Sequence, residues 1–284
     1  MTIPRKHHYL PQFYLRGFAS GKNQVWMFDL ASGIHAPIAV RDAATERDLY
    51  SMPDMDGKVD HASLEQRFSD EVEAPVAPVL KAVLDKTPIS RSDKEHLSRF
   101  VYTFFSRVPS GRDRLRAQAP HLAKQVLGNA IARIDPSLPE DKRAELIRAG
   151  NEIANFQAEH PPKEAMLPLD HGRVVPHLMA MRFVFVEVAK GFQFVTSDSP
   201  FAFDTSTGIS GSDFTLPLCS DLALIGTHSR VVQDLTYHFV PGRIGREINL
   251  RTIRSANRFV YSRSRQGWLN QASKSPHSFR RTMW

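Results

Sequence analysis

Residues 6–18, KHHYLPQFYLRGF, place two adjacent histidines and an arginine among aromatic and leucine side chains. Neighbouring residues of an extended chain point to opposite faces, so only one histidine would enter a given site, and His8 is the candidate because it is nearer the aromatic residues. A neutral imidazole there suits proton transfer or metal binding. If Pro11 opens a short helix, Gln12 and Arg16 share a face and aim an amide and a guanidinium at one place. The alternative gives His8 one anchoring hydrogen bond and Arg16 a structural ion pair.

A second polar group, Thr196-Ser197-Asp198-Ser199-Pro200, directly follows an apolar run late in the chain. A strand that ends in such a group presents its hydroxyls and carboxylate on a rigid support. Asp198 is a candidate general base or metal ligand, and Ser197 a candidate donor to an oxyanion. The same residues are also good turn formers, and a turn that presents one functional carboxylate satisfies both interpretations.

Motifs for the commonest metal and nucleotide sites do not occur in this sequence. It has no Walker loop, no Rossmann glycine pattern and no GxSxG elbow. A zinc centre is not expected from the spacing of the histidines, but a divalent metal held by Asp198 remains a candidate cofactor. The histidines without a metal-ligand spacing are His96, His121, His160, His171, His177, His228 and His238.

The formal net charge of +7 comes from the C-terminal region. Residues 251–284 carry eight Lys or Arg and no acidic residue, so the rest of the chain is close to neutral. Arg251, Arg254 and Arg258 recur at helical spacing and could form one ridge that binds phosphates. Nucleic acid is therefore a candidate partner, and a basic tail that serves solubility is the alternative.

No stretch of the sequence approaches the roughly 20 apolar residues of a membrane span, and its start lacks the apolar region of a signal peptide. We therefore expect a cytoplasmic protein without a membrane partner. The single cysteine, Cys219, excludes an intrachain disulfide, and we expect a buried structural thiol.

Apolar periodicity and turn residues predict the secondary structure. The first hairpin contains Pro37, which favours an edge strand. The expected elements are a hairpin of 24–30 with 34–40, an extended piece at 46–50, helices at 61–84 with a kink near Ala74, 90–105, 112–134, 139–158 and 173–181, a hairpin of 183–188 with 192–195, strands at 214–218 and 222–225, a helix at 244–257 and a strand at 259–261.

This layout predicts one α+β domain over residues 1–284. Residues 60–180 are mainly helical, 181–262 mainly strand, and 263–284 form a basic tail. We expect the N-terminal hairpin to join C-terminal strands in an antiparallel sheet, with the helices between them.

The N-terminal motif, the Glu46–Tyr50 piece and the late FVTSDSP run together resemble the bacterial family called domain of unknown function 4238. The similarity spans nearly the whole chain, including the region of Arg107. Its relatives carry Asn where this chain has Gly17 and Ser199. The resemblance implies the class of fold and implies no activity.

Two functions of different class fit these residues. The first is a phosphodiester-cleaving hydrolase, a nuclease or toxin-like enzyme, with His8 and Gln12 beside Asp198 and Ser197, and Arg16 and Arg107 on the phosphate. The second is a non-catalytic module that binds nucleic acid or protein through the basic C-terminal surface. Substrate, metal dependence and oligomeric state stay open at this point.

Overall fold

The computed structural model describes residues 5–161, 163–167, 174–203 and 213–272. Strands occupy both ends of the chain and helices fill its middle, which confirms the α+β organisation that the sequence predicts. The described strands form two larger sheets and two small ribbons, and all but one of their pairings are antiparallel.

The first sheet joins the two ends of the chain, as expected. Its strands, in order across the sheet, are β3 (His35–Ala39), β2 (Gln24–Asp29), β13 (Phe259–Ser262) and β8 (Thr196–Ser197). Val260 of β13 lies opposite Phe28 on one side and Ser197 on the other. Pro37 lies on the edge strand β3, where a missing N–H costs no ladder hydrogen bond.

The second sheet is formed only by later segments. Its strands, in order, are β12 (Thr236–Phe239), β7 (Arg182–Glu187), β11 (Leu222–Thr227), β10 (Phe214–Pro217) and β9 (Ala202–Phe203). Four consecutive residues of β7 are buried, because β7 is covered on both faces. Helix α8 (Gly242–Ser255) contacts β8 of the first sheet and β9 and β10 of the second.

The predicted hairpin of 183–188 with 192–195 is wrong. β7 pairs with β11 and β12, and the chain after Gly191 runs instead into β8 of the other sheet. The N–H of Phe194 donates to the carbonyl of Ser220 at 2.8 Å, and that of Val195 to the side chain of Asn249 at 3.0 Å. An apolar run buried between layers has the same composition as a hairpin strand, so sequence does not separate the two.

The kink expected near Ala74 is a π-helical turn. Residues Ser69–Glu73 form this turn between α2 (Ser63–Phe68) and α3 (Ala74–Leu84). The N–H of Ala74 donates to the carbonyl of Ser69, five residues back, and Pro75 has no N–H to continue a regular ladder. Glu73 is the last residue of this π-helical turn.

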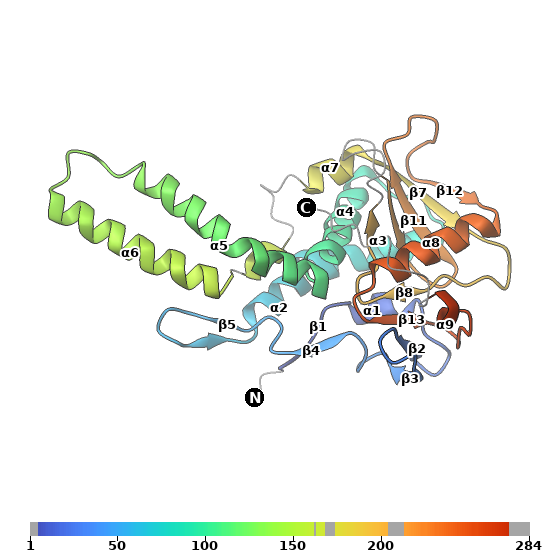
Figure 1. The fold of residues 1–284 in the computed structure, drawn as a ribbon. Helices are drawn as coiled ribbons and strands as arrows, with labels where there is room; N and C mark the ends of the chain where they lie inside the picture. The colour runs from blue at the N-terminus through green and yellow to red at the C-terminus, as the bar shows by residue number, and fades with distance from the viewer. Residues whose placement is uncertain (1–4, 162, 168–173, 204–212, 273–284) are drawn as a thin grey trace.

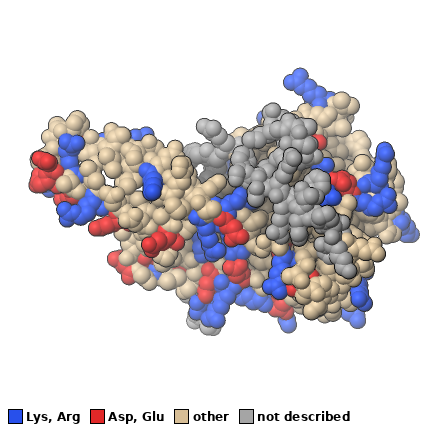
Figure 2. Space-filling view, in the orientation of Figure 1, with Lys and Arg blue, Asp and Glu red and all other residues tan. Residues whose placement is uncertain are grey.

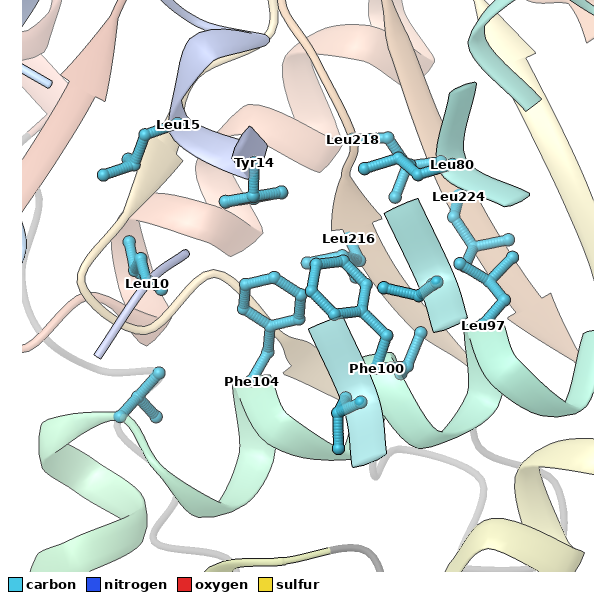
Figure 3. Packing of buried hydrophobic residues seen from close by; sticks show 14 of the residues in the cluster. Leu10, Tyr14, Leu15, Leu80, Leu97, Phe100, Phe104, Leu216, Leu218 and Leu224 are labelled. Carbon is cyan, nitrogen blue, oxygen red and sulfur yellow. The ribbon is translucent and has the colours of Figure 1, made fainter. Parts of the chain in front are cut away.

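The central core lies between α1 (Gln12–Arg16), α4 (Arg91–Ser106) and the second sheet (Figure 3). Ser90 and Asp93 form a capping box at the start of α4, close to the predicted boundary. Tyr14 is fully buried against Phe100 and Phe104, and its hydroxyl donates to the carbonyl of Pro217 at 2.8 Å. Phe100 and Phe104 of α4 therefore pack on Tyr14 of α1.

Helices α5 (Pro109–Ile131) and α6 (Glu140–Glu159) form an antiparallel pair, called the arm, that projects from the body (Figure 1). Both lie close to their predicted ranges. The remaining helices are a 3₁₀ turn (Lys163–Met166), α7 (Val174–Ala180), which packs on α4, and α9 (Leu269–Ala272).

Two short ribbons lie near the base of the arm. β1 (Lys6–His8) pairs with β4 (Thr45–Arg47), and β5 (Met52–Pro53) pairs with β6 (Val59–Asp60). In Figure 2, basic and acidic side chains are interspersed below the junction of arm and body. In the part of the chain that the structure describes, no helix is long and apolar enough to cross a membrane.

Candidate functional site

Residues 46–51, called the fastened segment, begin within β4 and are held by two arginines of the helical middle. Arg112 makes a two-pronged pair with Glu46, with N···O distances of 2.8 and 2.7 Å. Nε of Arg107 donates to the hydroxyl of Tyr50 at 2.7 Å. Both arginines come from the end of α4 and the start of α5, so these helices fix the segment.

Lys163 fastens the same segment from the 3₁₀ turn. Its Nζ donates to the carbonyls of Leu49, at 2.7 Å, and Ser51, at 2.8 Å. Burial lowers the pKa of Lys163, and the nearby positive charge of Arg116 lowers it further. Positive charge is therefore concentrated where the segment ends.

Arg107 is the centre of a buried network and does not face a ligand site. It is 3% exposed, its Nη1 donates to Glu73 at 2.7 Å, and its Nη2 to the carbonyl of His8 at 2.6 Å. Its guanidinium stacks 4.5 Å from the ring centre of Phe68. All three nitrogens have partners, which favours a structural role for Arg107 over the predicted phosphate contact.

The buried histidine of the N-terminal motif is His7. Its Nδ1 accepts the N–H of Tyr50 at 3.2 Å, and its Nε2 lies 3.6 Å from the carboxylate of Glu65. His8 is half-buried, and its Nε2 lies 3.1 Å from the carbonyl of Arg41, the single anchoring bond of the alternative interpretation. β1 turns the side chain of His7, rather than that of His8, into the core, and the bond to Arg41 favours the anchoring interpretation of His8.

Asp198 holds backbone rather than a ligand. Its Oδ1 accepts the N–H of Asn257 at 2.7 Å, and its Oδ2 those of Arg258 at 2.7 Å and Phe259 at 2.9 Å. Burial raises the pKa of Asp198, and the three N–H bonds act in the opposite direction. Because both oxygens are occupied and the residue is 1% exposed, these contacts favour the turn interpretation of Asp198 over the role as base or metal ligand. Ser197 likewise accepts the N–H of Ser199 at 3.2 Å.

The N-terminal segment and the 196–200 loop do meet, through other residues than predicted. The hydroxyl of Tyr14 lies 2.7 Å from that of Thr196, and Tyr9 lies 3.4 Å from Tyr261, hydroxyl to hydroxyl. These tyrosines are buried and bridge α1 to the first sheet. The contact is therefore part of the core.

Gln12 and Arg16 are not part of one site with His8. Gln12 is half-buried at the start of α1, and Arg16 is exposed at its end. Arg16 lines a separate hollow of about 290 Å³ beside Cys219. Burial raises the pKa of the Cys219 thiol, as expected for a structural cysteine.

The three C-terminal arginines do not form one helical ridge. α8 ends at Ser255, so Arg258 lies beyond it. Its Nη2 forms an ion pair with Oδ2 of Asp29 at 2.8 Å. Arg251 pairs with Glu247 one turn earlier at 3.1 Å, and Arg254 is the basic residue of the last turn. The tail residues 273–284 lie outside the described residues.

A cavity of about 960 Å³, called the arm-base cavity, lies between the β5–β6 ribbon and the base of the arm. Ser51, the last residue of the fastened segment, contributes to its wall. Its titratable and basic lining residues are Asp54, Lys58, Asp60, His61, Arg116, Glu159, His160 and Lys163. Among the described residues no group of three or more His, Cys, Asp or Glu could hold a metal ion.

His61 is oriented by the fastened segment. Its Nδ1 lies 2.6 Å from Oγ of Ser51 and 3.6 Å from Oδ1 of Asp48, and Ser51 donates to the same carboxylate at 3.4 Å. When Ser51 donates to Asp48, Nδ1 of His61 donates to Oγ of Ser51, and Nε2 is the basic nitrogen. Asp48 has φ of 56°, a left-handed conformation that costs a non-glycine residue energy and often marks functional sites.

Apolar side chains also line the arm-base cavity and are called its apolar wall. They are Ile153 and Phe156 from α6 and Met52 and Met55 from the ribbon. The ring of Phe156 lies 4.8 Å from that of His160, centre to centre. The cavity thus combines imidazoles and cations with a surface on which a flat group could stack.

Sequence reasoning did not identify His61, His160 and Arg116 as site residues. They come from three distant segments that no local motif links. The available signal was the pair Asp48 and Ser51, which lie within and directly after the Glu46–Tyr50 piece that carries the family resemblance.

Residues 6–266 match a family model described as "Protein of unknown function (DUF4238)", so the chain belongs to this family. No curated protein and no solved structure matches the chain.

Proposed function

We propose that this member of the DUF4238 family cleaves phosphodiester bonds of RNA in the arm-base cavity. One observation carries the proposal: two imidazoles, His61 and His160, line the same cavity as three cations, Lys58, Arg116 and Lys163. Cleavage of RNA through its own 2′-hydroxyl needs a base, an acid and positive charge at the phosphate. These side chains supply all three.

The chemistry assigns opposite roles to the two imidazoles. Nε2 of His61 takes the proton of the ribose 2′-hydroxyl, whose oxygen forms a bond to phosphorus. The bond from phosphorus to the 5′-oxygen breaks, and His160 as imidazolium gives that oxygen its proton. The products are a 2′,3′-cyclic phosphate and a 5′-hydroxyl end, and the exchanged protons leave His160 neutral and His61 charged.

Arg116 is the cation best placed for the phosphate. It is exposed, and among the described residues its ion-pair partner is Asp113, at 3.8 Å and equally exposed. Such a pair is weak and opens easily to a phosphate. Lys163 is a positioning residue, because its donors hold the carbonyls of the fastened segment.

The apolar wall supports a nucleic acid over a simple phosphate ester. Bases stack on aromatic side chains with little dependence on sequence. Phe156 and His160 provide such a surface beside Arg116. We therefore expect single-stranded RNA to be preferred over a duplex, whose bases are already stacked.

A non-catalytic nucleic-acid module is the second candidate, on the strength of the basic excess of residues 251–284. Within the described part of that region, Arg251, Arg258 and Arg263 already pair with acidic side chains of the chain itself. This pairing reduces the charge they offer to phosphates, which favours the first candidate.

The test is incubation of the purified protein with end-labelled single-stranded RNA and DNA, with Mg²⁺, with Mn²⁺ and with chelator. We expect cleavage of RNA and not of DNA, with the activity retained in chelator because the imidazoles need no metal. His61→Gln and His160→Gln should each lower kcat/KM by about 10²–10⁴-fold.

His121→Gln, which removes an exposed histidine of α5, is the matched control and should leave turnover unchanged. Circular dichroism verifies the folding of each variant. Cleavage by His61→Gln at the wild-type rate would refute the proposal, and salt-sensitive binding without cleavage would establish the second candidate in its place.

A further inference from the structure

His177 and His228 face each other on the body of the protein, outside the arm-base cavity. His177 lies on α7, and His228 is the residue after β11. Their Nε2 atoms are 3.3 Å apart, and both side chains are part-buried. The ring centres are 4.9 Å apart, with an interplanar angle of 60°.

These distances match the spacing of two metal ligands. A tetrahedral zinc ion holds imidazole nitrogens at about 2.05 Å, which places two such nitrogens about 3.3 Å apart and their ring centres about 5.2 Å apart. A linear N–H···N hydrogen bond of the same length would place the ring centres about 5.6 Å apart. The observed 4.9 Å is nearer the first value, so the two rings converge rather than meet end to end.

We propose that Nε2 of His177 and Nε2 of His228 bind one divalent transition-metal ion of the zinc type. Imidazole nitrogen is a preferred ligand for Zn²⁺, Ni²⁺ and Cu²⁺. Among the described residues no third His, Cys, Asp or Glu joins this pair.

The ion would connect two elements that are distant in sequence. α7 packs on α4, whereas β11 is a central strand of the second sheet. A ligand that binds the folded chain stabilises it, and one that bridges two elements also restrains their separation. The site is therefore a structural clip, separate from the chemistry proposed for the arm-base cavity.

The test is calorimetric titration of the full chain, stripped of metal with chelator and dialysed, with ZnCl₂. We expect one equivalent of Zn²⁺ to bind and to raise the melting temperature. His177→Gln and His228→Gln should each weaken the affinity by at least about tenfold and abolish the rise in melting temperature. His121→Gln, on the arm, should bind Zn²⁺ like the wild type.

A second measurement needs no variant. Zn²⁺ should protect His177 and His228 from modification by diethyl pyrocarbonate, mapped by mass spectrometry, while His121 stays reactive. Absence of Zn²⁺ binding by the wild type, unchanged binding by both variants, or unprotected His177 and His228 in saturating Zn²⁺ would each overturn the proposal.

Discussion

Replacement of Arg107 by Met tests whether this arginine holds the fastened segment rather than a ligand. Arg107→Met keeps much of the side-chain volume but removes hydrogen bonds of 2.7 Å to Tyr50, 2.7 Å to Glu73 and 2.6 Å to the carbonyl of His8. Loss of one partner from a buried pair costs about 3–5 kcal/mol. Glu73 keeps 26% of its side chain exposed and can be hydrated, so we expect about 3 kcal/mol.

Glu73→Gln is the matched partner substitution. It removes the negative charge but keeps an amide oxygen that can accept from Nη1 of Arg107, so we expect a smaller loss of about 1–2 kcal/mol. Urea denaturation followed by circular dichroism gives both values, and the double variant gives the coupling between the residues. A loss below about 1 kcal/mol for Arg107→Met would refute the structural role, because that is the range of surface substitutions.

Three further predictions concern the scaffold. Asp198→Asn should lower the free energy of unfolding by about 3 kcal/mol, measured in urea, because the NH₂ group of an amide cannot accept and all three N–H bonds cannot be kept. Turnover of the folded variant should persist. Lost activity with unchanged stability would contradict this prediction. Arg258 lowers the pKa of Asp29 to about 2, below its usual value. The stability difference between wild type and Asp29→Asn should therefore be full above about pH 4 and shrink as the pH falls towards 2. A difference that grows on acidification would contradict this prediction. Gly226→Ala should lower the melting temperature strongly, since a Cβ there would lie 1.9 Å from the buried ring of Phe214. An unchanged melting temperature would contradict this prediction and show that β10 and β11 move apart.

The parts of the fold that the sequence predicts carry local signals. The hairpin of β2 and β3 has alternating residues around a glycine link, and α4 begins at a capping box and shows one apolar stripe. The pairing of β2 with β13 followed from layout, because strands at both ends of a chain with a helical middle need a common sheet. The wrongly predicted hairpin of 183–188 with 192–195 lacked such a signal. Residues 183–186 and 194–195 are buried, so their apolar side chains do not show which strand each segment pairs with.

The candidate site was harder to predict because the same polar residue types serve catalysis in some proteins and hydrogen-bond buried groups in others. Asp198 and Arg107 have the residue types of a catalytic site, and in the structure each satisfies buried backbone or side-chain groups. The sequence shows which polar residues follow apolar runs, but it does not show where their partners lie. His61 lacked a motif because its partner Ser51 binds it across a ribbon.

The central claim is that phosphates bind in the arm-base cavity, and affinity for an uncleaved oligonucleotide tests it most directly. We would measure the fluorescence anisotropy of labelled single-stranded DNA with the wild type, Arg116→Gln and Arg251→Gln over a range of salt concentrations. Arg116→Gln should weaken binding and reduce the slope of log affinity against log salt by about 1, while Arg251→Gln, which breaks the helical pair with Glu247, should match the wild type. The reverse pattern, with binding lost in Arg251→Gln and kept in Arg116→Gln, would contradict the account and locate the nucleic acid on α8.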